Sequence, residues 1–443
     1  QASSGTRVVG ISLLIVALTS CALAMLWTVS LMTNDDTNMA AFASGDYTGQ
    51  PTAHLVFVSA PLGIVLAALH TVVRNVPWYA IMLISIDLCS VAVLVALAYM
   101  RRNQLRERGQ IAVLLLVVVA LPILLLRPSF TMAAIVLCTT GVIMLAAAVR
   151  SRSHAALLSW FGAICLGVGA MVRFDSFKGV VGMFLPFIAV VGFLLGWRRS
   201  LTALAVVTAL LGVSFASNRA LNSSSDWSSY TRFNEVRGQL SESIDFERAL
   251  ANPTDPAVAK VMKDIGWTED DAVLFISWLF YDPQVYSTSH LSELASLVSG
   301  PKYNSPIRDS ALSVFRTQRP LWILVLALGV AAVASRRRES LLLFLVQVTW
   351  CAAVFSVTAA SQRFPPRVSI PLYLALGVVL TLGIPLLWND RFVAHRWPPT
   401  GRRAGLAALL VACALVLFHG LSTGFTPWEI SRDNEAAIDA YHD

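Results

Sequence analysis

Charged residues are scarce in this sequence, at 13% of 443 residues, whereas 56% of the residues are hydrophobic. Because an average soluble domain carries roughly 25% charged residues, this composition excludes an ordinary cytosolic enzyme. The six cysteines all lie in apolar segments and none has CxxC spacing, so neither a disulfide framework nor a cysteine metal site is indicated. Internal repeats are also missing, which argues against a transporter built from inverted repeats.

Apolar runs of about 17–25 residues recur along almost the whole chain, and each is long enough to cross a bilayer core of roughly 30 Å. The net charge of +7 arises from short basic clusters between these runs, which is typical of cytoplasmic loops and not of a nucleic-acid-binding surface. The sequence therefore predicts an all-α polytopic membrane protein whose partner is the lipid bilayer, with no nucleic acid.

Eleven of the apolar runs are expected to be transmembrane helices. A further run, 54–73, is expected to be a re-entrant or interfacial helix, because a crossing there would place the basic cluster 101–108 on the same side as the acidic loop after the first span. The expected spans are about 8–32, 78–100, 111–126, 130–149, 155–171, 179–197, 200–217, 320–335, 340–360, 368–388 and 404–421.

The charges are divided unevenly between the two sides of this arrangement. The loops on the side of the N-terminus hold 16 basic and three acidic residues, and the other side holds 17 basic and 22 acidic residues, with Asp87 left inside a span. The positive-inside rule then predicts a cytoplasmic N-terminus and an extracytoplasmic C-terminus. Arginine far outnumbers lysine in an alanine- and valine-rich chain, which is typical of a GC-rich bacterial source, so we expect a bacterial inner or plasma membrane.

This topology predicts four segments along the chain. They are an N-terminal transmembrane module of seven spans with the first outer loop 33–77 (1–217), an extracytoplasmic segment with short helices (218–319), a C-terminal transmembrane module of four spans (320–421) and an extracytoplasmic tail (422–443). For Asp87, the acidic residue within a span, we favour a buried bond to a neighbouring hydroxyl or amide over proton coupling.

An acidic motif, Thr33-Asn34-Asp35-Asp36-Thr37-Asn38, directly follows the first span. Two adjacent carboxylates near a low dielectric repel each other, so such a pair usually has a cation, a hydrogen-bond partner or a proton to move. The alternative is a solvated acidic loop in which Asn34 or Asp35 ends or caps a helix. We favour the functional interpretation, because a polar, glycine-punctuated stretch follows and leads into a helix that does not fully cross.

The order of these features resembles the GT-C superfamily of integral-membrane glycosyltransferases. The shared features are a short N-terminal tail, one span, an acidic motif at its outer end, a loop with membrane-surface helices, and a next span that ends in a basic cytoplasmic loop. The pattern from Asn34 to Leu55, NDD…SGDYTG…HL, is similar to an uncharacterised bacterial branch of this superfamily. The resemblance implies transfer of a sugar from a polyprenyl-phosphate donor, such as decaprenyl phosphate, to a cell-envelope glycan or glycolipid acceptor outside the cytoplasm.

The acidic motif of the family falls on Asp35 and Asp36. In inverting members one such carboxylate is the general base, which removes the proton of the acceptor hydroxyl. The second acid would orient the acceptor or bind a divalent cation, Mg²⁺ or Mn²⁺. Some members of the family need a metal ion and others do not, so the resemblance leaves open whether this protein needs one. No other cofactor is implied, and Asn34 and His54 of the same motif are substrate-binding candidates.

A leaving polyprenyl phosphate gathers negative charge, so arginines on the outer side are expected to grip it in a bidentate fork. The donor-phosphate candidates are Arg363 and Arg367, in the proline-fixed turn QRFPPR, and Arg173 in the turn 171–178. The alternative for such residues is snorkelling to lipid phosphates, which we favour for Arg127. Arg173 has a second alternative, as a structural partner of Asp175.

Three residues of the large polar segment share one helical face by their spacing: Tyr230, Asn234 and Arg237. They fit a sugar-binding edge or, alternatively, a structural face that packs on the first outer loop. Two other functions stay open. A glycan polymerase or ligase of the O-antigen type predicts that Asp35 and Asp36 are dispensable and that His290 is not. A lipid or sugar transporter predicts transport that survives loss of both aspartates.

Overall fold

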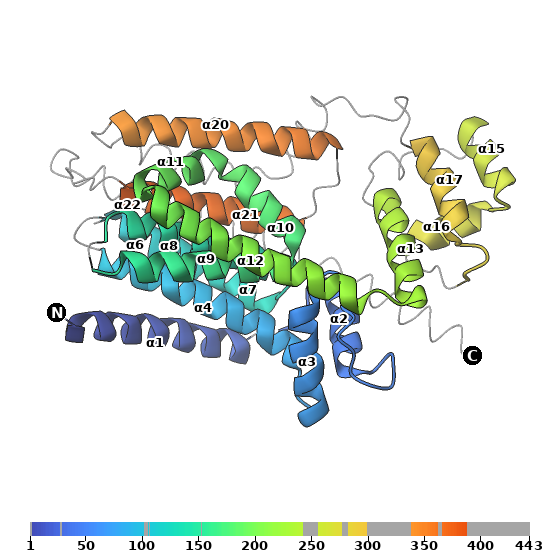
Figure 1. The fold of residues 1–443 in the computed structure, drawn as a ribbon, viewed down its shortest axis with the longest axis horizontal. Helices are drawn as coiled ribbons and strands as arrows, with labels where there is room; N and C mark the ends of the chain where they lie inside the picture. The colour runs from blue at the N-terminus through green and yellow to red at the C-terminus, as the bar shows by residue number, and fades with distance from the viewer. Residues whose placement is uncertain are drawn as a thin grey trace. The chain divides into compact units, whose positions relative to one another are not determined.

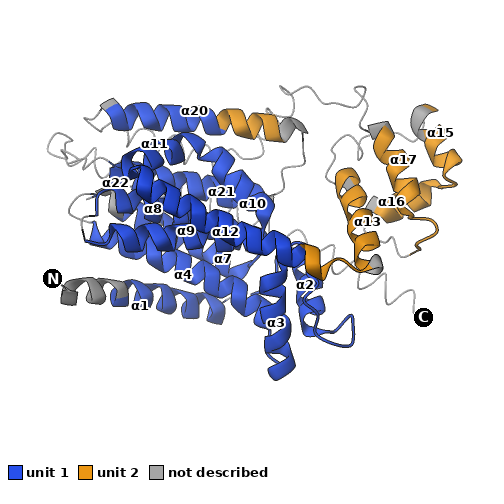
Figure 2. Cartoon of the chain, viewed as in Figure 1, with its two compact units in different colours: residues 1–218, 318–351, 365–443 blue, residues 219–317, 352–364 orange. Residues whose placement is uncertain are grey.

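The computed structural model describes residues 2–26, 29–101, 105, 107–151, 153–241, 256–276, 282–298, 338–361 and 366–387, and all regular structure in these ranges is helical (Figure 1). The chain divides into two compact units. Unit 1 comprises Gln1–Asn218, Gln318–Cys351 and Pro365–Asp443, and unit 2 comprises Arg219–Thr317 and Ala352–Phe364 (Figure 2).

Six helices in the described ranges are long and apolar enough to cross a membrane, and a bent pair brings the number to seven if it is one span. This confirms the prediction of an all-α protein with membrane-spanning character. The six are α4 (Trp78–Met100), α8 (Phe130–Val149), α9 (Ala155–Val172), α12 (Trp197–Leu221), α20 (Arg338–Ser361) and the continuous run of α21 (Pro366–Val378), η3 (Val379–Gly383) and α22 (Ile384–Leu387).

Two more expected spans correspond to shorter apolar helices. One is Gly10–Leu26, within α1 (Ala2–Leu26), and the other is Gln110–Leu126, within the run of α6 (Glu107–Leu114), η1 (Leu115–Ala120) and α7 (Leu121–Leu126). The expected spans 320–335 and 404–421 and the tail 422–443 lie outside the described residues, so the number eleven stays a prediction.

The run 54–73 contains a short helix, α3 (Ala60–Val72), of 13 residues. At about 1.5 Å per residue it covers roughly 20 Å, which is less than the bilayer core. The start of α3 is fixed to the helices of unit 1. The Ser59 and Ser214 hydroxyls lie 2.6 Å apart, the Ala60 amide donates to the Asn218 side chain (2.6 Å), and the Ser59 amide donates to the Met171 carbonyl (2.8 Å).

The expected span 179–197 is not one continuous helix. The segment is two helices, α10 (Phe174–Met183) and α11 (Leu185–Leu195), bent by 78° at their junction. The cause is Pro186, which has no backbone N–H to donate and whose ring clashes with the carbonyl four residues earlier.

Side chains of α20 satisfy the backbone groups that this break leaves unpaired. The Gln347 side-chain amide donates to the Met183 carbonyl (2.8 Å), and its oxygen accepts from the Phe187 amide (3.2 Å). The Trp350 indole donates to the Gly182 carbonyl (2.7 Å). Because an unpaired backbone group is costly in hydrocarbon, a buried glutamine at this position stabilises the break.

Helix α8 forms the centre of unit 1 and packs against α4, α9, α10, α11 and α21. Small residues let α8 and α9 approach closely, as is common between membrane helices. A Cβ atom on Gly141 would lie 2.6 Å from the Gly162 carbonyl oxygen, and one on Gly162 would lie 2.8 Å from the Gly141 carbonyl oxygen. Further along, a Cβ on Gly169 would lie 2.4 Å from the Cys138 sulfur.

Unit 2 has a hydrophobic core of its own, in which Trp267, Phe275 and Tyr286 form an aromatic cluster with ring centroids 5.2–6.1 Å apart. The Trp267 indole donates to the Val285 carbonyl (2.9 Å), so its polar atom is satisfied. The described helices of this unit are α13 (Ser225–Ser241), α15 (Pro256–Asp264), α16 (Glu269–Ile276) and α17 (Thr288–Val298).

Asp87 in α4 is buried, at 1% exposure, and neither of its carboxylate oxygens has a hydrogen-bond partner within the described part of the chain. The hydroxyl of Ser90, one turn later, also lacks one. The expected bond to a neighbouring hydroxyl or amide is therefore not found among these residues.

We predict that Gly141→Ala destabilises the protein by about 1–3 kcal/mol, because the new methyl group overpacks the backbone contact between α8 and α9. Gly212→Ala in α12 is the matched control, since a Cβ there meets no atom within 4 Å. It should be neutral or stabilise by up to about 1 kcal/mol, because alanine is the better helix former. Unfolding in mixed micelles by increasing SDS would measure both, and equal midpoints would contradict the close packing.

Candidate active site

The acidic motif after the first span begins a helix, α2 (Asn34–Ser44), instead of forming a loop. Its N-cap is Thr33, not Asn34 or Asp35 as the solvated-loop interpretation expected. The Thr33 hydroxyl accepts from the Asp36 amide (3.2 Å) and donates to the Asp36 carboxylate (2.6 Å). This reciprocal arrangement satisfies one backbone donor at the start of the helix, the Asp36 amide, and fixes the direction of the Asp36 side chain.

Asp36 is completely buried and accepts hydrogen bonds from three different elements. Besides Thr33, the donors are the Tyr79 hydroxyl at the start of α4 (3.1 Å) and the Phe130 amide at the start of α8 (2.9 Å). Burial raises the pKa of Asp36 above its usual range, and the hydrogen bonds from Thr33, Phe130 and Tyr79 oppose that rise. One carboxylate thus joins the ends of α2, α4 and α8.

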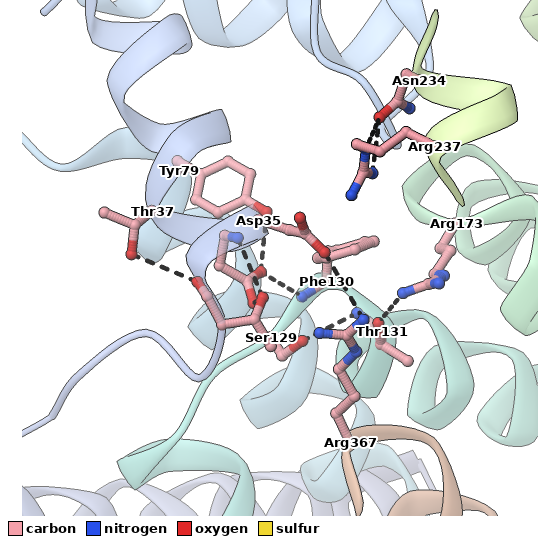
Figure 3. Close-up of polar contacts among 12 residues, drawn as sticks. Asp35, Thr37, Tyr79, Ser129, Phe130, Thr131, Arg173, Asn234, Arg237 and Arg367 are labelled. Atoms are coloured by element: carbon pink, nitrogen blue, oxygen red, sulfur yellow. Dashed lines mark hydrogen bonds and ion pairs between the residues drawn. The ribbon is translucent and has the colours of Figure 1, made fainter. Parts of the chain in front are cut away.

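Asp35 is adjacent in sequence and has a different environment. Its side chain is 14% exposed, and its Oδ2 lies 3.8 Å from the Nη2 of Arg367 at the start of α21 (Figure 3). That distance is an ion pair, but it is too long for a hydrogen bond. The Arg367 side chain is 23% exposed, and its Nε has no hydrogen-bond partner within the described residues. The Nε atom is itself buried, so this unsatisfied N–H lies inside the protein beside the ion pair.

Arg173, between α9 and α10, lies beside the start of α8. Its guanidinium donates to the Thr131 hydroxyl and stands over the rings of Phe130 (4.7 Å) and Phe57 (5.7 Å), which are themselves stacked 5.4 Å apart. Phe130 therefore bonds to Asp36 through its amide and contacts Arg173 through its ring. Asp175, the alternative partner expected for Arg173, forms an exposed ion pair with Lys178 (2.6 Å).

The other predicted residues of the first loop have local roles in the structure. Asn34 is exposed at the first position of α2, and His54 is half-buried, with its amide donating to the Thr52 hydroxyl (3.3 Å). Arg127 donates to the Ser30 hydroxyl (2.5 Å). Arg363 lies outside the described residues.

The predicted sugar-binding edge belongs to unit 2. The Arg237 guanidinium donates from Nε (3.1 Å) and Nη2 (2.7 Å) to the Asn234 oxygen, and the exposed Tyr230 ring packs edge-on against Trp227 (5.4 Å). Nδ1 of His290, the residue that the polymerase or ligase alternative requires, lies 2.9 Å from the Val285 carbonyl oxygen. This short local contact is structural in character and adds no support to that alternative.

No pattern in the sequence identified Tyr79, Phe130, Thr131 and Phe57 as parts of the site. A tyrosine at the start of an apolar run is typical of a membrane interface, so Tyr79 carried no distinctive signal. Phe130 contributes its backbone amide, which no side-chain pattern reveals. A possible clue was Ser129-Phe130 before an apolar run, because serine is a favoured N-cap, and Ser129 does cap α8.

We predict that Tyr79→Phe destabilises the protein by about 1.5–3 kcal/mol, because the buried Asp36 carboxylate loses one of its donors. Tyr99→Phe in the same helix is the control, since its hydroxyl makes no hydrogen bond with the described residues; it should change stability by less than about 0.5 kcal/mol. SDS unfolding midpoints in mixed micelles would compare the two variants. Equal losses of stability in the two variants would contradict the hydrogen bond from Tyr79 to Asp36.

Asp36 should also make stability depend on pH. Because its pKa is higher in the folded than in the unfolded chain, folding binds a proton in the window above 3.8, the ordinary value for aspartate. The contribution of Asp36 to the free energy of unfolding is therefore fully present below pH 3.8. It is lost as the pH rises through the higher pKa that Asp36 has in the folded chain. Asp36→Asn should flatten this part of the profile of unfolding free energy against pH.

No group of three or more His, Cys, Asp or Glu side chains suited to a metal ion is present among the described residues. The chain also matches no family model, no curated protein and no solved structure. What the site does must therefore be inferred from its own residues: a buried carboxylate that joins three helices, a second carboxylate facing an arginine, and a further arginine beside the start of α8.

Proposed function

We propose that this protein is a GT-C-type membrane glycosyltransferase that moves a sugar from a polyprenyl-phosphate donor to a cell-envelope glycan or glycolipid. The observation that supports the proposal most directly is the difference between two adjacent acids. Asp36 is buried and fully engaged by donors, whereas Asp35 is partly exposed and faces Arg367 at 3.8 Å. A carboxylate beside a cation is the pair that transfer from a phosphate-linked sugar requires.

Asp35 is the general base in this proposal, and Asp36 is a positioning residue. A base must reach the acceptor hydroxyl at roughly 2.6–3.2 Å, and only the partly exposed carboxylate has room for that contact. Because its contact with Arg367 is longer than a hydrogen bond, the Asp35 oxygens keep lone pairs for the acceptor. Asp36 holds the start of α2 against α4 and α8 and so fixes the residue before it.

Arg367 binds the donor phosphate in this proposal. Its side chain is partly exposed and lies 3.8 Å from Asp35, and a guanidinium binds phosphate, as it binds carboxylate, in bidentate geometry. As the acceptor oxygen forms its bond to the anomeric carbon, the bond from that carbon to the phosphate oxygen breaks. The electron pair goes to the phosphate, next to Arg367, and the acceptor proton goes to Asp35.

The membrane setting fits this chemistry. Several helices are long and apolar enough to span a bilayer, so a donor with a polyprenyl tail would reach the site from within the membrane. Transfer on the extracytoplasmic side of a bacterial inner or plasma membrane, with N-terminus inside, is part of the proposal and depends on the charge distribution of the loops.

The test is sugar transfer in membranes that contain the wild type, Asp35→Asn or Asp36→Asn at equal protein levels. Labelled polyprenyl-phosphate sugars are offered one at a time, with and without EDTA. Asp35→Asn should lower the rate by about 10²–10⁴, the usual contribution of a general base. Asp36→Asn should lower the transfer rate by a smaller factor, because an asparagine oxygen can still accept hydrogen bonds from the Phe130 amide and the Tyr79 hydroxyl.

Two results would contradict the proposal. Unchanged transfer in Asp35→Asn would show that the general base is not Asp35. It would favour the glycan polymerase or ligase, which depends on His290 in the large polar segment. Absence of transfer by the wild type from every donor would reject the glycosyltransferase and favour a transporter. Loss of activity with EDTA would show that a divalent cation takes part.

A further inference from the structure

The segment after α2 folds back on that helix and leaves one aromatic side chain exposed. Gly45 ends α2 with φ +89°, and a Cβ atom there would lie 2.4 Å from the backbone of Gln50, so only glycine fits. The Thr52 amide donates to the Phe42 carbonyl (3.2 Å), which closes the loop against the helix. The tip of this closed loop carries Tyr47.

Tyr47 is 62% exposed, yet two contacts hold it in place. Its hydroxyl donates to the Asn38 side chain (3.2 Å), and its ring packs edge-on against Phe42, with centroids 5.5 Å apart. An aromatic ring that is both exposed and held in position loses little conformational entropy when a ligand packs on it. These are the properties of a binding platform.

The same face of α2 connects this ring with the proposed base. Asn38 follows Asp35 by three residues, so the two side chains are neighbours on the helix surface. Asp35, Asn38 and Tyr47 therefore form a continuous row: a carboxylate, an amide and an aromatic ring. A chain of linked sugars has matching features, because its hydroxyls bond to carboxylates and amides and the C–H face of a sugar ring packs on an aromatic ring.

We propose that Tyr47 and Asn38 form a subsite for a sugar unit of the acceptor, next to the unit whose hydroxyl Asp35 deprotonates. The subsite rests on the proposed function, because it assumes a carbohydrate acceptor at Asp35. It identifies that acceptor as an oligosaccharide or glycan, with at least two linked sugars, and not a single sugar or a lipid alcohol.

The neighbours of Tyr47 argue against the alternative of a lipid anchor. The adjacent Asp46 is exposed and accepts from the Ser44 hydroxyl (2.7 Å), and the exposed Thr48 hydroxyl donates to the Gln50 carbonyl (2.6 Å). A carboxylate next to the ring is costly to insert into hydrocarbon, and the tyrosine hydroxyl bonds to the protein instead of pointing to lipid headgroups.

The test measures binding of neutral trisaccharides to the full chain in nanodiscs by saturation-transfer difference NMR. The probes are maltotriose, mannotriose, galactotriose and arabinotriose. We expect the wild type to bind at least one, Tyr47→Ala to bind it about tenfold or more weakly, and Tyr47→Phe, which keeps the ring, to retain most of the affinity. Phe193→Ala, an exposed aromatic position in α11, is the control and should bind like the wild type.

Equal binding by the wild type and Tyr47→Ala, or no binding of any probe by the wild type, overturns the subsite. Asp35→Asn separates the two proposals, because it should lower the transfer rate by about 10²–10⁴ while trisaccharide binding persists. Binding through Tyr47 without transfer from any polyprenyl-phosphate sugar would reject the glycosyltransferase and leave a carbohydrate-binding site. Transfer that depends on Asp35 but not on Tyr47 would retain the enzyme and reject the subsite.

Discussion

The buried carboxylate of Asp36 is the interaction on which the candidate site depends. It accepts from the cap of α2, from Tyr79 in α4 and from the first amide of α8, so it fixes the positions of three helix ends at once. A carboxyl group inside a protein is costly unless hydrogen-bond partners surround it, and two of the donors here come from segments far apart in the sequence. The same bonds that satisfy its oxygens therefore bring those segments together.

Helix α8 connects the hydrogen bonds of Asp36 with the rest of unit 1. Its first residue bonds to Asp36 through the amide and supports Arg173 through the ring, while its later residues pack glycine to glycine against α9. Arg173 in turn precedes the broken helix α10–α11, whose unpaired backbone groups are satisfied by Gln347 of α20. Arg173, the arginine beside the start of α8, thus belongs to a network of hydrogen bonds and close packing that extends through the apolar helices of unit 1.

The two acids of the motif differ because consecutive residues of a helix point in directions about 100° apart. At the first turn of α2, that rotation turns Asp36 toward α4 and α8 and leaves Asp35 beside Arg367. Neighbouring aspartates can then serve separate purposes, one as an anchor and one as a reactive group. The loop that follows adds Tyr47 to the same face as Asp35, so a single short helix would join catalysis with acceptor recognition.

The sequence alone determined the membrane character, the all-helical class and the position of the acidic motif, because hydrophobic length and charge distribution are local properties. The expected span 78–100 even has the same bounds as α4. Which aspartate is buried, which distant residues donate to it, and which side chain satisfies the backbone at the 78° break were decided by tertiary structure alone. The bonds of Tyr79 and Phe130 to Asp36, and those of Gln347 to the break, join residues 43 to 164 positions apart, and such contacts leave no trace in the periodicity of a single chain.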